Sequence, residues 1–252
     1  MSRLVKRIIA YLIDILIITT VCQSLSNTTI MNPNLNKYEK YRKEYNETYI
    51  SYIKYVGDLS KYYEDKKLTE KEYTKLIERN KDYEELTNKY YKDSKLTEKN
   101  YTKLLKELAN TYKKIAEEAT YNLEKNSISE KIIYLLLVIL YFIGFNYITN
   151  GQTLGKKVMK LKIENIDENK KVPITSYIIR ALLMYQTIYY ITKLIAILFL
   201  PKAEYNNVIS VAYSIQNILD FAIITVIILR TSDGRGLHDL LAKTKVVPVK
   251  KK

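Results

Sequence analysis

The chain has 252 residues, with 41 Lys and Arg against 27 Asp and Glu, one His and one Cys, for a formal net charge of +14. The single cysteine, Cys22, excludes an intramolecular disulfide framework and a cysteine-rich metal site. The single histidine, His238, excludes a multi-histidine metal centre. The sequence has no G-x-x-x-x-G-K-[ST] or G-x-G-x-x-G loop for phosphate binding. We therefore predict neither a metal site nor a cofactor.

The charge is distributed unevenly along the chain. Residues 26–130 carry 21 basic and 19 acidic side chains, whereas the other residues carry 20 basic and 8 acidic ones and nearly all the long apolar runs. A net charge of +14 is typical of nucleic-acid binders, but the charges in 26–130 interleave and form no basic stripe. We predict no nucleic-acid partner, and two parts of different character.

The first apolar run covers residues 8–25 and follows a basic N-terminal segment that contains Arg3, Lys6 and Arg7. A signal peptide has this order of segments, but Asp14 interrupts the run and no small-residue cleavage site follows it. We therefore predict an uncleaved membrane span.

Arg7, Ala10 and Asp14 lie on one face of this span, because residues three, four and seven positions apart share a helix face. A carboxylate in lipid is costly unless it is protonated or has a cationic partner. Asp14 therefore either locks two helices through an ion pair or binds a proton or a cation. The structural role is slightly favoured.

Residues 26–130 form a polar insert with an internal repeat: KLTEKEYTKL at 67–76 recurs as KLTEKNYTKL at 95–104. Thr69 and Glu72 match a capping box, which marks a helix start. Tyrosines at spacings of three and four from Tyr38 to Tyr55 predict one packed helix face. We predict a coiled-coil-like bundle of three helices, at about 35–64, 70–92 and 98–125. The same tyrosines would also suit a surface for a protein partner, but the bundle explains the spacing by itself.

Three further runs, at 131–149, 181–200 and 208–229, are long enough to cross a bilayer and are apolar on all sides. Ionisable and amide groups within such runs are candidates for function. In the last two runs they are Gln186, Lys193, Gln216, Asn217 and Asp220. Two alternatives are a structural pair between Lys193 and Asp220, and a transport path that both residues line. Gln216, Asn217 and Asp220 are expected on one face.

The Lys and Arg residues next to the spans predict the orientation, since they favour the cytoplasmic side. They precede the first span, lie between the second and third, and follow the fourth, at Arg230 and Lys250–Lys252 among others. The predicted fold is therefore an all-α membrane protein with four transmembrane helices and both termini in the cytoplasm. The insert lies on the extracytoplasmic side, and the lipid bilayer is the main partner.

Two segments outside the spans, residues 150–157 and 233–244, hold four of the six glycines. In a chain with so little Gly, this clustering indicates special backbone conformations or close packing, although turns at helix ends explain part of it. Nearby, the β-branched runs at 161–166 and 243–247 are expected to pair as two short strands.

With these motifs the chain resembles the RDD family of bacterial membrane proteins, over residues 1–25 and 131–249. The family is named for an Arg and an Asp in its first span and an Asp near its end. The matching positions are Arg7, Ala10 and Asp14; Gly151, Gln152, Thr153, Gly155 and Lys156; Arg180; and His238 and Asp239. The insert departs from the family, whose first two spans are usually joined by a short loop.

The resemblance implies a multi-pass protein of the bacterial cell membrane, and some relatives are linked to monovalent cation/proton antiport. The first functional hypothesis is therefore transport of cations or protons, with Asp14 as the first candidate for the titrating group and Asp220 as the second. The alternative is a non-transporting anchor or assembly scaffold that presents the insert to a partner. We do not predict an enzyme, since no nucleophile–base pair is apparent. Asp239 is expected to pair with Arg7 or Arg180.

Overall fold

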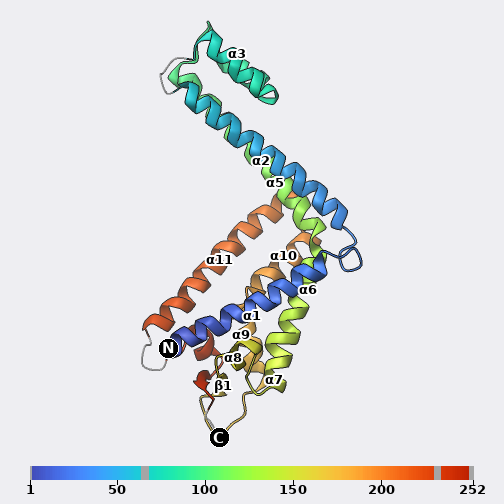
Figure 1. The fold of residues 1–252 in the computed structure, drawn as a ribbon, viewed down its shortest axis with the longest axis vertical. Helices are drawn as coiled ribbons and strands as arrows, with labels where there is room; N and C mark the ends of the chain where they lie inside the picture. Colours follow the sequence, from blue (N-terminus) through green and yellow to red (C-terminus); the bar gives the residue numbers. More distant parts are fainter. Residues whose placement is uncertain (1, 64–67, 230–233, 250–252) are drawn as a thin grey trace. The chain divides into compact units, whose positions relative to one another are not determined.

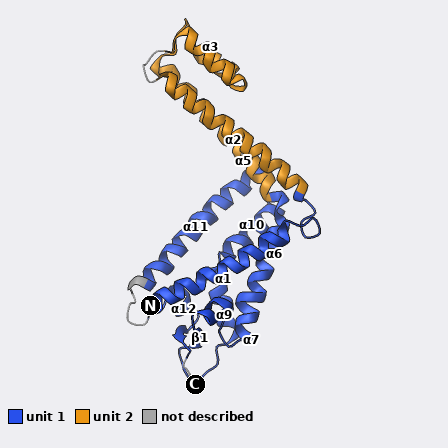
Figure 2. Cartoon of the chain, in the orientation of Figure 1, with its two compact units in different colours: residues 1–35, 125–252 blue, residues 36–124 orange. Residues whose placement is uncertain are grey.

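The computed structural model describes residues 2–63, 68–229 and 234–249 (Figure 1). The chain divides into two compact units, residues 1–35 with 125–252 and residues 36–124, coloured separately in Figure 2. Arg230 and Lys250–Lys252, used above for the orientation, and Asp233 of the second glycine-containing segment lie outside the described residues.

Three helices of the first unit are long and apolar enough to cross a membrane, and they contain the runs predicted at 8–25, 131–149 and 208–229 almost entirely. The middle one is continuous through a π-helical stretch, η2. These segments are α1 (Arg3–Ser26), α6 (Ile128–Leu137) with η2 (Val138–Phe145) and α7 (Asn146–Ile148), and α11 (Lys202–Leu229).

The run at 181–200 is not one helix, which corrects the prediction. It is divided between α9 (Ile174–Met184) and α10 (Thr187–Phe199), which are bent by 72°. Gln186, at the break, has a left-handed backbone with φ 51°. A tertiary contact supplies a partner to a carbonyl at the break, as a membrane requires: Tyr134 Oη donates to the Tyr185 carbonyl at 2.7 Å. Within the segment, Thr187 Oγ1 donates to the Ala181 carbonyl at 2.7 Å. By length and composition, the unit therefore has three helices that could cross a membrane, or four if the bent pair counts as one broken span.

A small antiparallel sheet makes the all-α expectation incomplete. Strand β1 (Leu161–Asn165) pairs with β2 (Thr244–Pro248), with Ile163 opposite Val246, as the β-branched runs predicted. Ile163 and Val246 are buried with Ala10 of α1 and Tyr177 of α9 in one cluster. Two short helices flank the sheet in sequence, α8 (Leu154–Val158) before β1 and α12 (Leu237–Leu241) before β2.

A second cluster lies where α1, the helix made by α6 and η2, and the end of α9 meet. It contains aliphatic and aromatic side chains from all three segments: Ile18, Cys22, Tyr134, Val138, Phe142, Ala181 and Tyr185. Phe142 and Tyr185 stack with ring centroids 3.5 Å apart. Because Tyr185 sits at the break between α9 and α10, this stacking anchors the break within the unit.

The second unit has a core of its own, formed by the repeat. Leu68 and Leu76 of one copy and their counterparts Leu96 and Leu104 of the next are all buried. Tyrosine rings from different segments of the insert also stack on one another, and the ring centroids of Tyr55 and Tyr83 are 4.4 Å apart. The long helices are α2 (Leu35–Tyr63) and α5 (Glu98–Asn126).

The middle helix of the insert, predicted at 70–92, is broken in the structure. It consists of α3 (Glu70–Arg79), a 3₁₀ turn η1 (Lys81–Tyr83) and α4 (Glu84–Tyr90). The capping box of Thr69 and Glu72 is confirmed at the start of α3. The break lies at Asn80, whose side-chain amide donates to the Leu76 carbonyl at 2.9 Å. Asn side chains compete with the helical backbone in this way.

Candidate functional site

Asp239 of α12 lies between two arginines that come from distant parts of the chain. Arg7 of α1 donates from Nη2 to its Oδ2 at 2.6 Å, and Arg180 of α9 donates to its Oδ1. Arg180 also donates to Thr244 Oγ1 at 2.9 Å. The Asp239 side chain is fully buried, which opposes ionisation, but the positive charges of Arg180 and Arg7 outweigh burial and hold the pKa of this carboxyl well below its usual range. Both pairs expected for Asp239 are therefore formed, and they tie α1, α9 and α12 together.

Asp14 is 1% exposed and binds the start of α8. Its Oδ1 accepts hydrogen bonds from the Gly155 backbone N–H at 2.8 Å and from Tyr141 Oη at 2.7 Å, and its Oδ2 accepts one from Thr153 Oγ1. Thr153 is the N-cap of α8, so a negative charge here also suits the helix dipole. The amount of hydrogen bonding favours the structural role of Asp14 over a titrating one.

Lys156 supplies the cation expected near Asp14. Its Nζ lies 3.9 Å from Asp14 Oδ2 and donates to Thr153 Oγ1 at 3.0 Å. Burial lowers the pKa of Lys156 to about 8, although the Asp14 carboxylate raises it. A lysine with this pKa exchanges its proton near neutral pH.

Gly155 lets α8 approach α1 more closely than any other residue would. A Cβ atom on Gly155 would lie 2.1 Å from the Ala10 carbonyl oxygen and 2.9 Å from Asp14 Oδ1. Ala10 itself is 2% exposed. The helix face that Arg7, Ala10 and Asp14 share therefore packs against two short helices. Arg7 binds α12, and Ala10 and Asp14 contact α8.

Gly151 and Gln152 place the loop before α8 against the sheet. Gly151 has φ 88°, and a Cβ there would lie 2.5 Å from the Ile163 carbonyl oxygen. Gln152 Nε2 donates to the Leu161 carbonyl at 3.1 Å. The glycines thus serve close backbone packing as well as turns.

Several of these side chains line a cavity of about 390 Å³ inside the first unit. Its walls are mainly apolar, with residues of α1 and α11 among them. Its polar and charged lining includes Arg7, Asp14, Lys156, Arg180, Gln186, Asp220 and His238. The cavity thus brings together predicted site residues from α1, α8, α9, α11 and α12.

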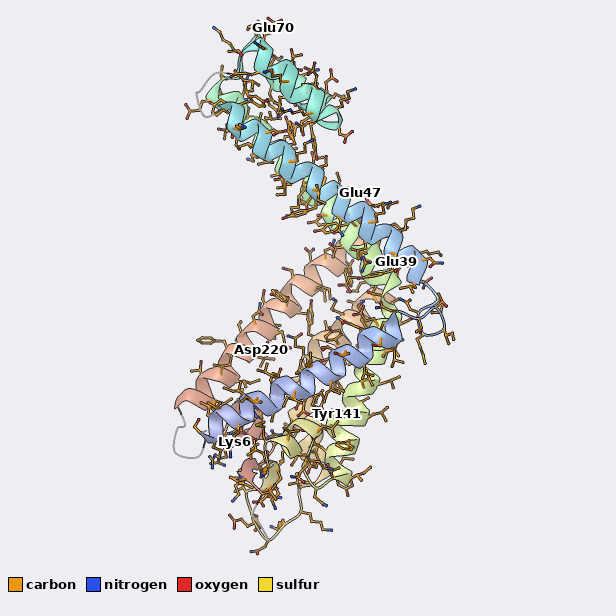
Figure 3. The ribbon with its side chains drawn as sticks, in the orientation of Figure 1. Lys6, Glu39, Glu47, Glu70, Tyr141 and Asp220 are labelled. Atoms are coloured by element: carbon orange, nitrogen blue, oxygen red, sulfur yellow. The ribbon has the colours of Figure 1, made fainter. Side chains whose placement is uncertain are left out.

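Of the candidates in the last two apolar runs, Asp220 lines this cavity and Lys193 does not. Asp220 is half-buried and accepts a hydrogen bond at 2.9 Å from Nε2 of Gln216, which is buried. The Lys193 ammonium lies over the Tyr189 ring, 5.3 Å from its centroid. Asn217 is exposed, contrary to the shared face expected for it, because successive helix residues are about 100° apart. Figure 3 labels Asp220 on α11 and Tyr141 on η2.

Tyr141 is a site residue that the sequence analysis missed. Its hydroxyl donates to Asp14 and accepts from the Leu154 backbone N–H at 3.0 Å, so it links η2 to the start of α8. The residue was counted as apolar within the run at 131–149. The only signal was a phenolic hydroxyl in a lipid-length segment, where such a group needs a partner.

His238 is 1% exposed, and its ring nitrogens form no hydrogen bond within the part of the chain that the structure describes. Its Nε2 lies 3.3 Å from Asp239 Oδ2, without hydrogen-bond geometry. Burial, together with the positive charges of Arg180 and Arg7, lowers the pKa of His238 to about 4, and Asp239 only partly opposes this shift. The imidazole is therefore neutral at physiological pH.

The lowered pKa of His238 predicts that the folded protein loses stability in acid. Between pH 6.5 and 4 the unfolded chain takes up the histidine proton and the folded chain does not, so the free energy of unfolding falls as the pH falls. The full shift amounts to about 3 kcal/mol. We expect His238→Phe to remove the part of the decline between pH 6.5 and 5, as measured by thermal unfolding in detergent. Since the chain has one histidine, an unchanged decline in the variant would contradict the shift.

No group of three or more His, Cys, Asp or Glu side chains suited to a metal ion occurs among the described residues. What the arrangement offers instead is a set of buried ion pairs beside an apolar cavity with one further carboxylate.

Comparison with known families identifies the arrangement. Residues 118–243 match the model of the RDD family. Nothing among the curated proteins or the solved structures compared with the chain matches it. The first helix lies before the matched stretch, but Arg7, Ala10 and Asp14 bind residues inside it, at Asp239 and Gly155. With half of its length matched, and with helices apolar enough for a membrane, the chain belongs to the RDD family of membrane-type proteins.

Proposed function

We propose that this protein transports a monovalent cation or a proton across the membrane, with Asp220 as the residue that binds it. The observation that carries the proposal is the environment of this carboxylate. It lies on an apolar helix and lines the cavity, and among the described residues it pairs with no cationic side chain. A carboxylate at membrane depth without a cationic partner is a natural binding group for a proton or a cation.

The other two buried carboxylates are less suited to this role. Asp14 accepts hydrogen bonds from three donors, and Asp239 is bound by two arginines. Protonating either one would break contacts that hold the unit together. We therefore assign the ion-binding role to Asp220 and a structural role to Asp14.

The proposal includes an orientation: both termini and the α8 segment face the cytoplasm of a bacterial cell, and the insert is extracytoplasmic. It is supported by the basic residues that precede α1 and lie between α7 and α9, on the side that the positive-inside rule favours.

The test is flux through proteoliposomes that contain the purified full chain. We expect proton-coupled flux of a monovalent cation in the wild type and its loss in Asp220→Asn, which keeps the size of the side chain and removes its charge. Glu204→Gln is the matched control, since Glu204 is an exposed acid on the same helix. Flux that survives Asp220→Asn, or a wild type without flux, would overturn the proposal.

The alternative is a non-transporting scaffold, and one observation favours it: residues 36–124 form a compact unit with their own core, almost entirely outside the stretch matched to the family. Such a unit could bind a protein partner while the apolar helices anchor it. The flux measurement separates the two functions, since a scaffold predicts none.

A further inference from the structure

We infer that the cation bound at Asp220 is an organic monovalent cation with apolar substituents, such as a quaternary ammonium or phosphonium ion. The inference rests on the proposed function and narrows its substrate class. Three properties of the cavity carry it: a carboxylate with no counter-charge beside it, the apolar chemistry of the walls, and the small number of oxygen atoms available to bind a metal ion.

The first property is charge. Arg7 and Arg180 are both bound to Asp239, and Lys156 lies beside Asp14. Asp239 offsets one of the two arginines and Asp14 offsets Lys156, so these groups leave one positive charge, and Asp220 brings the sum of the charges to zero. Among the described residues no cationic side chain contacts Asp220, so it is a carboxylate without a counter-charge beside it. A ligand with a single positive charge would supply that local counter-charge.

The second property is the apolar surface around that charge. Near Asp220 on α11 the cavity is lined by Ile223, Ile224 and Ile227, and α1 contributes Leu4 and Ile8. A volume of about 390 Å³ lies within the range of sites for small organic molecules. Such walls cannot replace the water molecules around a small ion, but the burial of apolar substituents against them makes the free energy of binding more favourable.

Aromatic rings in the same walls suit the charged centre of such a ligand. Tyr11 and Tyr185 both line the cavity, and their rings stack with centroids 6.0 Å apart and 15° between their planes. The face of an aromatic ring attracts a positive centre, and ammonium ligands are recognised in this way.

The third property is the shortage of free oxygen atoms. A metal ion stripped of water needs a shell of oxygen ligands, as ion-selective filters supply with carbonyls. Here the Asp14 oxygens are already bound by donors, and the Tyr11 hydroxyl donates to the Met184 carbonyl at 3.4 Å. The Asp220 carboxylate and the Gln186 side-chain amide, which also lines the cavity, fall short of such a shell, whereas an onium ion needs only one counter-charge and apolar contacts.

The experiment is calorimetric titration of the purified full chain in detergent with tetraphenylphosphonium chloride. We expect saturable binding that weakens at least tenfold in Asp220→Asn and persists within threefold in Asp220→Glu, which keeps the charge. Glu204→Gln should bind as the wild type does. Size-exclusion chromatography and thermal unfolding verify that each variant is folded. If Asp220→Asn does not fold, the binding measured for Asp220→Glu decides whether the inference holds.

Absence of saturable binding, or binding that is equal in the wild type and Asp220→Asn, would overturn the inference. The inference would also be overturned if sodium or potassium chloride displaced the phosphonium ion with an affinity equal to that of the phosphonium ion, since the site would then accept inorganic ions. The proposed function is judged separately, because proton-coupled flux of sodium or potassium lost in Asp220→Asn would sustain it even without phosphonium binding.

Discussion

Gly155→Ala is expected to separate α8 from α1 and to destabilise the first unit by about 3 kcal/mol, the upper end of the usual cost of overpacking. The new Cβ would lie 2.1 Å from the Ala10 carbonyl oxygen, which belongs to a helix backbone and cannot rotate away. It would also lie 2.9 Å from Asp14 Oδ1, so the hydrogen bond from the Gly155 N–H would be lost with the contact. The measurement is the midpoint of thermal or denaturant unfolding in detergent.

Two other glycines provide matched controls. A Cβ on Gly144 would be 3.6 Å from the Ile139 carbonyl oxygen, an ordinary contact, and one on Gly57 would meet nothing within 4 Å. Gly57→Ala should stabilise the exposed face of α2 by roughly 0.5–1 kcal/mol, because glycine is unfavourable within a helix. If Gly155→Ala unfolds at the midpoint of the wild type, the close approach of α8 to α1 is refuted.

Asp239→Ala is expected to have the largest effect of any single substitution, about 3–5 kcal/mol. It would leave the guanidinium groups of Arg7 and Arg180 without their shared counter-charge, although their side chains are only 11% and 6% exposed. Two buried like charges would then repel each other across the site. We expect the unfolding transition to lose its cooperativity or its midpoint to fall strongly. The measurement is thermal unfolding in detergent, monitored by circular dichroism.

A double-mutant cycle separates the ion pair from other consequences of this change. Adding Arg180→Met to Asp239→Ala should recover part of the loss, since it removes one of the two unpaired charges. Glu117→Ala serves as the control, because its exposed pair with Lys113 should contribute less than about 1 kcal/mol. Strict additivity of Arg180→Met and Asp239→Ala would contradict the coupling that the structure shows.

The positions of most helices could be predicted because the responsible forces act locally. Length and hydropathy located α1, the α6–η2–α7 helix and α11, and helical periodicity placed Arg7, Ala10 and Asp14 on one face. The repeat likewise placed Leu76 and Leu104 in equivalent positions, and both are buried. The capping box at Thr69 is another local feature, and it forms as predicted.

The failures have a common physical cause. The break between α9 and α10 lies within an apolar run, and it is stabilised by Tyr134 and by the stacking of Phe142 on Tyr185. The break at Asn80 depends in part on Asp58 of α2, which accepts from its side-chain amide at 3.1 Å. In each case a partner distant in sequence stabilises a local conformation that the segment alone does not favour.

The uneven distribution of charge and of apolar residues along the chain is sufficient to separate the polar insert from the apolar helices. By itself the sequence determined which segments are helical, which are apolar enough for lipid, and which motifs match the RDD family, because these properties depend on nearest neighbours and on composition. Only the tertiary structure decided that Asp239 binds both arginines, that Asp14 holds α8, and that Asp220 is left facing a cavity. These contacts join residues that are 59 to 232 positions apart in the sequence, and periodicity and composition carry no information about such distances.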